Sequence, residues 1–236
     1  FSSFSKTSKR KFHSISVYIR NHLKGHVIRV PDEDDDLEMV HLIIKNTTPV
    51  CNMFASYLDV ESRGTTDDTS KVWHKLQGKI DAAIQKGEAA ILLGDLNRPL
   101  QTGINSSFGT KLVDLWLEEE SVVLLNDRDI CTRVDPATGK GSLLDVGITS
   151  KNIGKAVTNF EADTDKKWTP FSMSKNAQKT ILKKFTDHRS FSFNVTLPCI
   201  LTNIKKKTNR LTIAIQILVV SRINFNKFKT STNFSR

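Results

Sequence analysis

The sequence predicts a layered α/β domain, in which β-sheets pack against α-helices. Short apolar or alternating segments recur along most of the 236 residues, as expected for strands. Two longer segments carry apolar residues at helical spacing instead. A hydrophobic content of 38% is sufficient for the core of one sizeable domain. Many short strands with few helices predict packed sheets flanked by helices.

Nine segments are predicted strands because they are short, rich in β-branched or aromatic residues, and bounded by turn residues. They are 14–19, 26–30, 37–44, 50–56, 89–94, 121–126, 142–149, 155–161 and 190–197. Residues 89–93 are continuously apolar, which is typical of a strand that is buried on both faces. Residues 191–195 alternate, which is typical of a half-buried strand.

Two helices are predicted from apolar residues that recur on one stripe. The first spans 67–85, with Asp68 near its start. Its stripe consists of Val72, Leu76, Ile80 and Ile84. The second spans 108–120 and carries Leu112, Leu115 and Trp116 at the same spacing. We interpret both stripes as core.

The most informative motif is the apolar run Ile91-Leu92-Leu93, followed by Gly94-Asp95-Leu96-Asn97. The glycine permits a bend, so a carboxylate emerges at the end of a core strand. If the backbone stays extended, alternation sends Asp95 and Asn97 to the same side, where an acid and an amide can reach one phosphate. Taken alone, the motif also fits an ordinary turn at the end of a strand.

Two further motifs place acids at strands. Thr186-Asp187-His188 precedes the segment 190–197 and can supply a metal ligand and a group that donates a proton or stabilises a phosphate. An isolated Asp-His pair also fits a surface turn. Leu143-Leu144-Asp145-Val146 places an acid inside an apolar strand. A buried carboxylate is costly without a partner, so we expect a group such as a histidine nearby.

The order and combination of these motifs resemble the endonuclease/exonuclease/phosphatase superfamily, and within it the apurinic-type endonuclease domain of non-LTR retrotransposons. The resemblance covers residues 13–197. The segments that carry it are 16–21, 37–40, 54–57, 94–97, 124–126, 142–145 and 186–188. It implies the fold of that superfamily, which is two packed mixed β-sheets flanked by helices in a four-layer sandwich.

The resemblance also implies roles in the hydrolysis of a phosphodiester. Asp95 would orient or deprotonate the attacking water. Asn97 would hold the scissile phosphate. Apart from the resemblance, Arg98 is a candidate contact to the substrate, because it is one of the cations that could line a groove for DNA. Tyr57 would contact the phosphate or stabilise the leaving oxygen.

The remaining implied roles belong to the later motifs. His188 would stabilise charge on the phosphate, and Asp145 would fix the orientation of its imidazole. Asp187 would lie beside a divalent metal ion, Mg²⁺ or alternatively Mn²⁺. The ion would offset charge that develops on the phosphate and the leaving group.

One expected segment has no counterpart. Members of the superfamily hold their metal with a glutamate in an early segment, after a first strand that ends in asparagine. Residues 1–13 contain no acid, so we expect the first strand and the metal-binding glutamate to be missing, as in an N-terminally truncated chain. Glu33 lies in an acidic run and Glu38 fits a later strand, so both are poor substitutes. Whether the chain is an active enzyme is therefore an open question.

Charge divides the chain into three parts. Residues 1–12 carry four Lys or Arg, residues 198–236 carry eight, and neither part contains an acid. With a formal net charge of +10, residues 13–197 therefore carry −2. We expect 1–12 to be disordered, 13–197 to be the domain, and 198–236 to be a basic tail. The apolar stretch 211–220 in this tail is either an added strand or helix or a segment outside any domain, and it is too short to span a membrane.

The hypothesis from the sequence is a monomeric, magnesium-dependent DNA-nicking endonuclease of retrotransposon type. Its expected partner is DNA and not a membrane. The longer protein from which such a domain derives can also carry a reverse transcriptase domain. Three cysteines without metal spacing fit an intracellular location, nuclear if the chain is active. The alternatives are a phosphatase or lipid phosphodiesterase of the same superfamily, a catalytically inactive remnant that binds nucleic acid, and a translated fragment without function.

Overall fold

The computed structural model describes nine ranges of the chain: 2–7, 14–19, 25–31, 37–60, 65–103, 107–135, 138–162, 191–198 and 210–217. Their centre is a six-stranded mixed sheet in the order β3-β4-β5-β6-β10-β7. Its strands are β3 (Val27–Val30), β4 (Met39–Ile44), β5 (Cys51–Tyr57), β6 (Ala89–Asp95), β7 (Val122–Leu124) and β10 (Asp145–Ser150). Only the pair β5 and β6 is parallel among these six strands.

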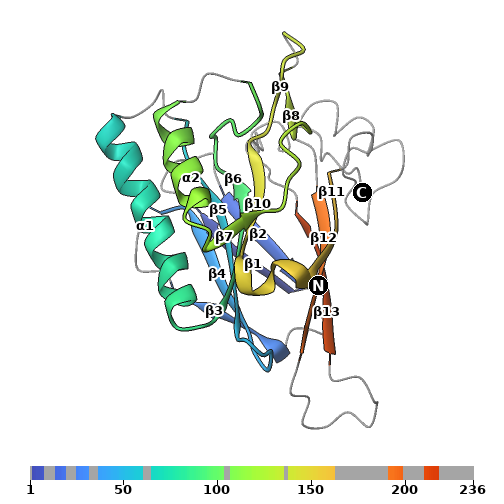
Figure 1. The fold of residues 1–236 in the computed structure, drawn as a ribbon. Helices are drawn as coiled ribbons and strands as arrows, with labels where there is room; N and C mark the ends of the chain where they lie inside the picture. The colour runs from blue at the N-terminus through green and yellow to red at the C-terminus, as the bar shows by residue number, and fades with distance from the viewer. Residues whose placement is uncertain are drawn as a thin grey trace, which may run out of the picture.

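Two helices cover one face of this sheet (Figure 1). They are α1 (Thr66–Gln85), which connects the parallel strands β5 and β6, and α2 (Phe108–Glu118). Trp73 of α1 and Trp116 of α2 meet edge to face, with ring centroids 5.6 Å apart. The indole nitrogen of Trp116 donates a hydrogen bond to Asp81 Oδ1 at 3.0 Å, so the buried tryptophan keeps a polar partner.

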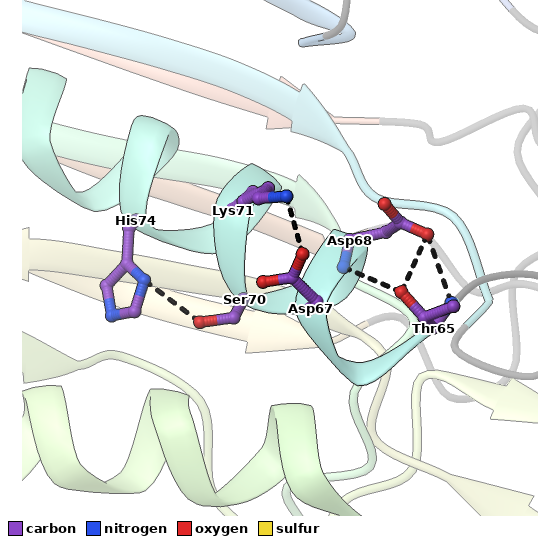
Figure 2. Close-up of polar contacts among 6 residues, drawn as sticks. All are labelled: Thr65, Asp67, Asp68, Ser70, Lys71 and His74. Carbon is purple, nitrogen blue, oxygen red and sulfur yellow. Dashed lines mark hydrogen bonds and ion pairs between the residues drawn. The ribbon is translucent and has the colours of Figure 1, made fainter.

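The start of α1 is fixed by a capping box, which Figure 2 shows. Thr65 Oγ1 accepts a hydrogen bond from the backbone nitrogen of Asp68, and Asp68 Oδ2 accepts one from the backbone nitrogen of Thr65. These bonds satisfy two N–H groups that an uncapped helix leaves without partners. The hydrogen bond from the Thr65 hydroxyl also lowers the pKa of Asp68.

Shorter sheets lie on the other face of the central sheet. One pairs β1 (Ser2–Thr7) with β2 (Ser14–Ile19), and another has the order β11-β12-β13. The strands of the second are β11 (Val157–Ala162), β12 (Phe191–Pro198) and β13 (Arg210–Ile217). A second apolar core joins these layers and includes Ile19, Leu42, Ile91, Leu93 and Val195. A separate hairpin, β8 (Arg133–Val134) and β9 (Gly141–Ser142), lies beyond the end of the central sheet.

The predicted fold class, an α/β sandwich of packed sheets and helices, is confirmed. Within the described ranges the layers are the two helices, the mixed central sheet and a layer of antiparallel strands, rather than two mixed sheets between two helical layers. All nine predicted strands and both helices are present, with ends shifted by a few residues. Two details of the helix stripes differ. Trp73 rather than Val72 lies at the centre of the α1 face, and Leu115 of α2 is 58% exposed.

The ends of the domain also differ from expectation. Ser2–Thr7 forms strand β1, where we expected disorder, because this segment pairs along its whole length with β2 and buries part of Phe4 in the second core. Arg210–Ile217 forms β13, which pairs with β12. Both strands lie outside the predicted domain 13–197. None of the described helices is long and apolar enough to cross a membrane.

Candidate active site

Three predicted site residues lie side by side at one end of the central sheet. Tyr57 ends β5, Asp95 ends β6 and Asp145 begins β10. The strand register pairs Asp95 with Tyr57 on one side and with Asp145 on the other. Asp95 and Asp145 are each 1% exposed, and Tyr57 is 8% exposed. Strand pairing thus brings together residues that are far apart in the sequence.

Strand alternation places the three side chains on the face that is opposite to the helices. In β6, Ala90 and Leu92 belong to the helix-side core, whereas Ile91 and Leu93 belong to the core between the sheets. Asp95 follows the second set, because side chains alternate along a strand. Its paired neighbours Tyr57 and Asp145 share that face. We call Tyr57, Asp95 and Asp145 the row. It therefore lies at the edge of the space between the central sheet and the second layer of strands.

Gly94 brings β5 and β6 close together immediately before Asp95. Its φ of +148° is rarely adopted by residues with a side chain, and a Cβ at this position would lie 1.8 Å from the carbonyl oxygen of Ser56. The glycine of the Gly-Asp motif is therefore required by the backbone geometry that presents the carboxylate.

The loop after Asp95 is tied to strands on both sides. Asp95 Oδ1 accepts a hydrogen bond from the backbone nitrogen of Asn97 at 2.9 Å, and Asn97 itself has a φ of +49°. Asn97 Nδ2 donates to the carbonyl oxygen of Leu58 at 2.6 Å. On the opposite side, the backbone nitrogen of Leu96 donates to the carbonyl oxygen of Leu144 at 3.0 Å. Asn97 is only partly buried, so the loop holds its amide near the surface beside the carboxylate.

Arg98 has a different environment from the one expected of a cation that lines a groove. It is 3% exposed, and its Nη1 donates to the carbonyl oxygens of Asp59 at 2.9 Å and Asn97 at 3.1 Å. Its guanidinium thus fastens the loop to the end of β5. Arg98 thus shapes the loop, and its predicted contact with the substrate stays a prediction.

Two residues that sequence analysis gave no role hold the backbone around Asp145. Thr132 Oγ1 accepts hydrogen bonds from the backbone nitrogens of Asp145 at 2.9 Å and Leu144 at 3.1 Å. Asn126 Nδ2 donates to the carbonyl oxygen of Asp145 at 3.1 Å, and its Oδ1 accepts from the backbone nitrogen of Gly147 at 2.7 Å. Both side chains are buried. The sequence pointed only to Asn126, as part of a motif shared with the family.

Glu38 adds another carboxylate to the same edge. It precedes β4, and its carbonyl oxygen accepts hydrogen bonds from Tyr57 N at 3.0 Å and Ser56 Oγ at 3.2 Å. Alternation from Val40 directs its side chain to the face that carries Tyr57. Glu38 Oε2 is buried, and no residue in the described ranges gives it a hydrogen bond. Sequence analysis had considered this residue only as a poor replacement for a metal ligand.

The described residues alone do not fit a metal ion. No group of three His, Cys, Asp or Glu side chains among them is arranged to hold one. The predicted metal neighbour Asp187 and the predicted phosphate-stabilising residue His188 both lie outside the described residues. The structure consequently brings together Tyr57, Asp95, Asn97 and Asp145, and it leaves the other two predictions open.

Comparisons with known proteins bear on the fold. No protein-family model matches the sequence, and no curated protein matches it. Among solved structures, the chain is similar to the endonuclease domain of TRAS1, a telomere-specific non-LTR retrotransposon, with 17% identity and a TM-score of 0.57 over 82% of this chain and 80% of that one. At this identity the likeness establishes the fold alone.

Two weaker likenesses carry no argument of their own. One is to an AP endonuclease from Archaeoglobus fulgidus, with 14% identity and a TM-score of 0.39 over 53% of this chain and 57% of that one. The other is to a truncated Caenorhabditis elegans TDP2, with 10% identity and a TM-score of 0.46 over 72% of this chain and 68% of that one.

Proposed function

We propose that this chain, whose fold is similar to that of the TRAS1 endonuclease domain, hydrolyses phosphodiesters and nicks DNA as a monomeric endonuclease of the retrotransposon type. The observation that carries the proposal is the alignment of Tyr57, Asp95 and Asp145 on three adjacent strands, with Asn97 held beside them. The order of motifs and the similarity to the TRAS1 domain favour the retrotransposon type over other members of the fold.

The chemistry follows from the groups in this row. A carboxylate that is buried at a strand end is a suitable general base for an attacking water, and Asp95 is fixed there by the register and by the hydrogen bond from Asn97 N. The Asn97 amide and the Tyr57 hydroxyl are neutral donors that would bind phosphate oxygens without repelling them. Asp145 lies on the other side of Asp95 from Tyr57. Its predicted role is to orient the imidazole of His188.

Magnesium stays a prediction. A divalent ion would neutralise charge on the phosphate and the leaving oxygen. Because the described residues do not form a metal site by themselves, we derive no step through an ion. Dependence on Mg²⁺ or Mn²⁺ is tested directly by the assay below.

A second candidate function is DNA binding without cleavage. One observation favours it: the net positive charge of the chain comes from 1–12 and 198–236, which carry twelve Lys or Arg and no acid. Lysine and arginine bind the phosphate backbone without reading its sequence, and such binding weakens steeply as salt is added.

The test is the nicking of supercoiled plasmid by the full chain, with Mg²⁺ and with a chelator in its place. We expect relaxed circles with Mg²⁺, and about 100-fold or greater loss of rate in Asp95→Asn and Asn97→Ala. The matched control is Asp129→Asn, which changes an exposed aspartate that is not part of the row. A phosphate-release arm with a phosphomonoester separates an endonuclease from a phosphatase.

The outcomes are distinct. Equal rates in the wild type, Asp95→Asn and Asp129→Asn would remove the catalytic assignment. Salt-sensitive binding of the plasmid without nicking would support the second candidate function. Release of phosphate from the monoester without nicking would support a phosphatase.

A further inference from the structure

The edge of β10 that faces β7 has a different hydrogen-bond partner at Asp145 than along the rest of the strand. Further along β10, Ile148, Thr149 and Ser150 pair with the backbone of β7. β7 ends at Leu124, so it does not extend alongside Asp145. The polar groups of the Asp145 backbone on that edge are buried and need other partners.

Two side chains take the place of the missing strand. The Asn126 carboxamide donates to the carbonyl oxygen of Asp145 and accepts from the nitrogen of Gly147, which is the pattern that a backbone peptide makes in a ladder. Leu125 N continues this pairing by donating to the carbonyl oxygen of Gly147 at 2.8 Å. Thr132 Oγ1 then accepts from the nitrogens of Asp145 and Leu144.

We infer that Asn126 and Thr132 are positioning residues that hold Asp145 opposite Asp95. Thr132 is fully buried and Asn126 is 8% exposed, so water competes little for these hydrogen bonds. Both the nitrogen and the carbonyl oxygen of Asp145 are bound by side chains, so at this outer edge of β10 its position depends on these two residues, while β6 pairs with its other edge. The part of this inference that concerns catalysis rests on the proposed function.

The direct test is amide hydrogen exchange, measured by NMR on the full chain. Thr132→Val keeps the shape of the side chain and removes the acceptor, whereas Thr132→Ser keeps the acceptor. We expect exchange at Leu144 and Asp145 to become about 3- to 10-fold faster in Thr132→Val and to stay near the wild-type rate in Thr132→Ser. Asn126→Leu removes both the donor to the Asp145 carbonyl oxygen and the acceptor for the Gly147 nitrogen, and is expected to speed exchange at Gly147.

The matched control is Thr149→Val. This change also removes one buried hydroxyl hydrogen bond from β10, to the carbonyl oxygen of Ala90, but at the far end of the strand. We expect it to leave exchange at residues 144–147 unchanged. Unchanged exchange at Leu144 and Asp145 in a folded Thr132→Val would overturn the inference, whether or not the chain nicks DNA.

The second readout is the kinetics of nicking. A displaced Asp145 is expected to lower kcat by about 10- to 100-fold in Thr132→Val and Asn126→Leu, with little change in KM, and Thr132→Ser should restore most of kcat. If Thr132→Val exchanges faster at Leu144 and Asp145 but has the same kcat as Thr149→Val, the positioning role is contradicted. If the wild type does not nick at all, the proposed function fails, and the exchange data alone decide how Asp145 is held.

Discussion

Asp95 and Asp145 lie directly opposite each other on the neighbouring antiparallel strands β6 and β10, and both side chains are 1% exposed. Burying two carboxylates at paired positions costs folding free energy, because water solvates neither of them fully. Such an arrangement is retained where function needs it.

The first prediction concerns Gly94. In Gly94→Ala the added Cβ would meet the carbonyl oxygen of Ser56 at 1.8 Å, so β5 and β6 have to separate. We expect the free energy of unfolding to fall by about 3 kcal/mol or more, measured by urea denaturation. Gly78→Ala in α1 is the control, because a Cβ there meets no atom within 4 Å, and it should raise stability by about 0.5–1 kcal/mol. Equal stability of the two variants would contradict the close approach at Gly94.

The second prediction separates two roles for Arg98. Arg98→Met keeps most of the side-chain volume and removes the donors to the carbonyl oxygens of Asp59 and Asn97. Because these bonds are buried, we expect the free energy of unfolding to fall by about 2 kcal/mol, against about 0.5 kcal/mol or less for Arg29→Met on the exposed part of β3. An unchanged stability with a raised KM for DNA would instead support the predicted contact of Arg98 with the substrate.

Much of the fold could be predicted because its signals are local. The continuous apolar run of β6 and the alternation of β12 indicated strands, and the stripe of α1 with Asp68 at its start indicated a helix. Strand β1 was missed because a segment rich in serine and lysine becomes a strand only by pairing with β2. For the same reason the sequence leaves the stretch that includes β13 open between an added strand, an added helix and a segment outside any domain.

The site was predictable in its residue types but not in its geometry. The motif around Asp95 and Asn97 is local, whereas the register that places Asp145 opposite Asp95 depends on residues far apart in the sequence. The roles of Thr132 and Arg98 depend on hydrogen bonds between side chains and backbone, which leave no periodic pattern. Arginine is also rarely buried to this degree, so exposure was the natural expectation.

The third prediction is a pH dependence from Cys51. Burial raises the pKa of its thiol from 9.0 to about 12. The unfolded chain loses this proton near pH 9, and the folded chain keeps it. Between these two values the folded state binds more protons, so its stability falls as pH rises, by up to about 1.4 kcal/mol per pH unit.

Comparison with Cys51→Ala isolates this effect, since all other groups titrate in both proteins. From pH 8 to pH 10.5 we expect the wild type to lose about 2 kcal/mol more of its free energy of unfolding than the variant does. Identical losses in urea denaturation would show that the Cys51 thiol is not held in a buried, neutral form.

The most direct test that Asp95 and Asp145 share one site is a double-mutant cycle. The measured quantity is the single-turnover rate of plasmid nicking, for the wild type, Asp95→Asn, Asp145→Asn and the double variant. Residues that serve one chemical step are strongly non-additive, so the double variant should be about as slow as Asp95→Asn alone. If the loss of rate in the double variant equals the product of the losses in the two single variants, a common site at the ends of β6 and β10 is contradicted. A wild type that is no faster than the double variant would contradict it as well.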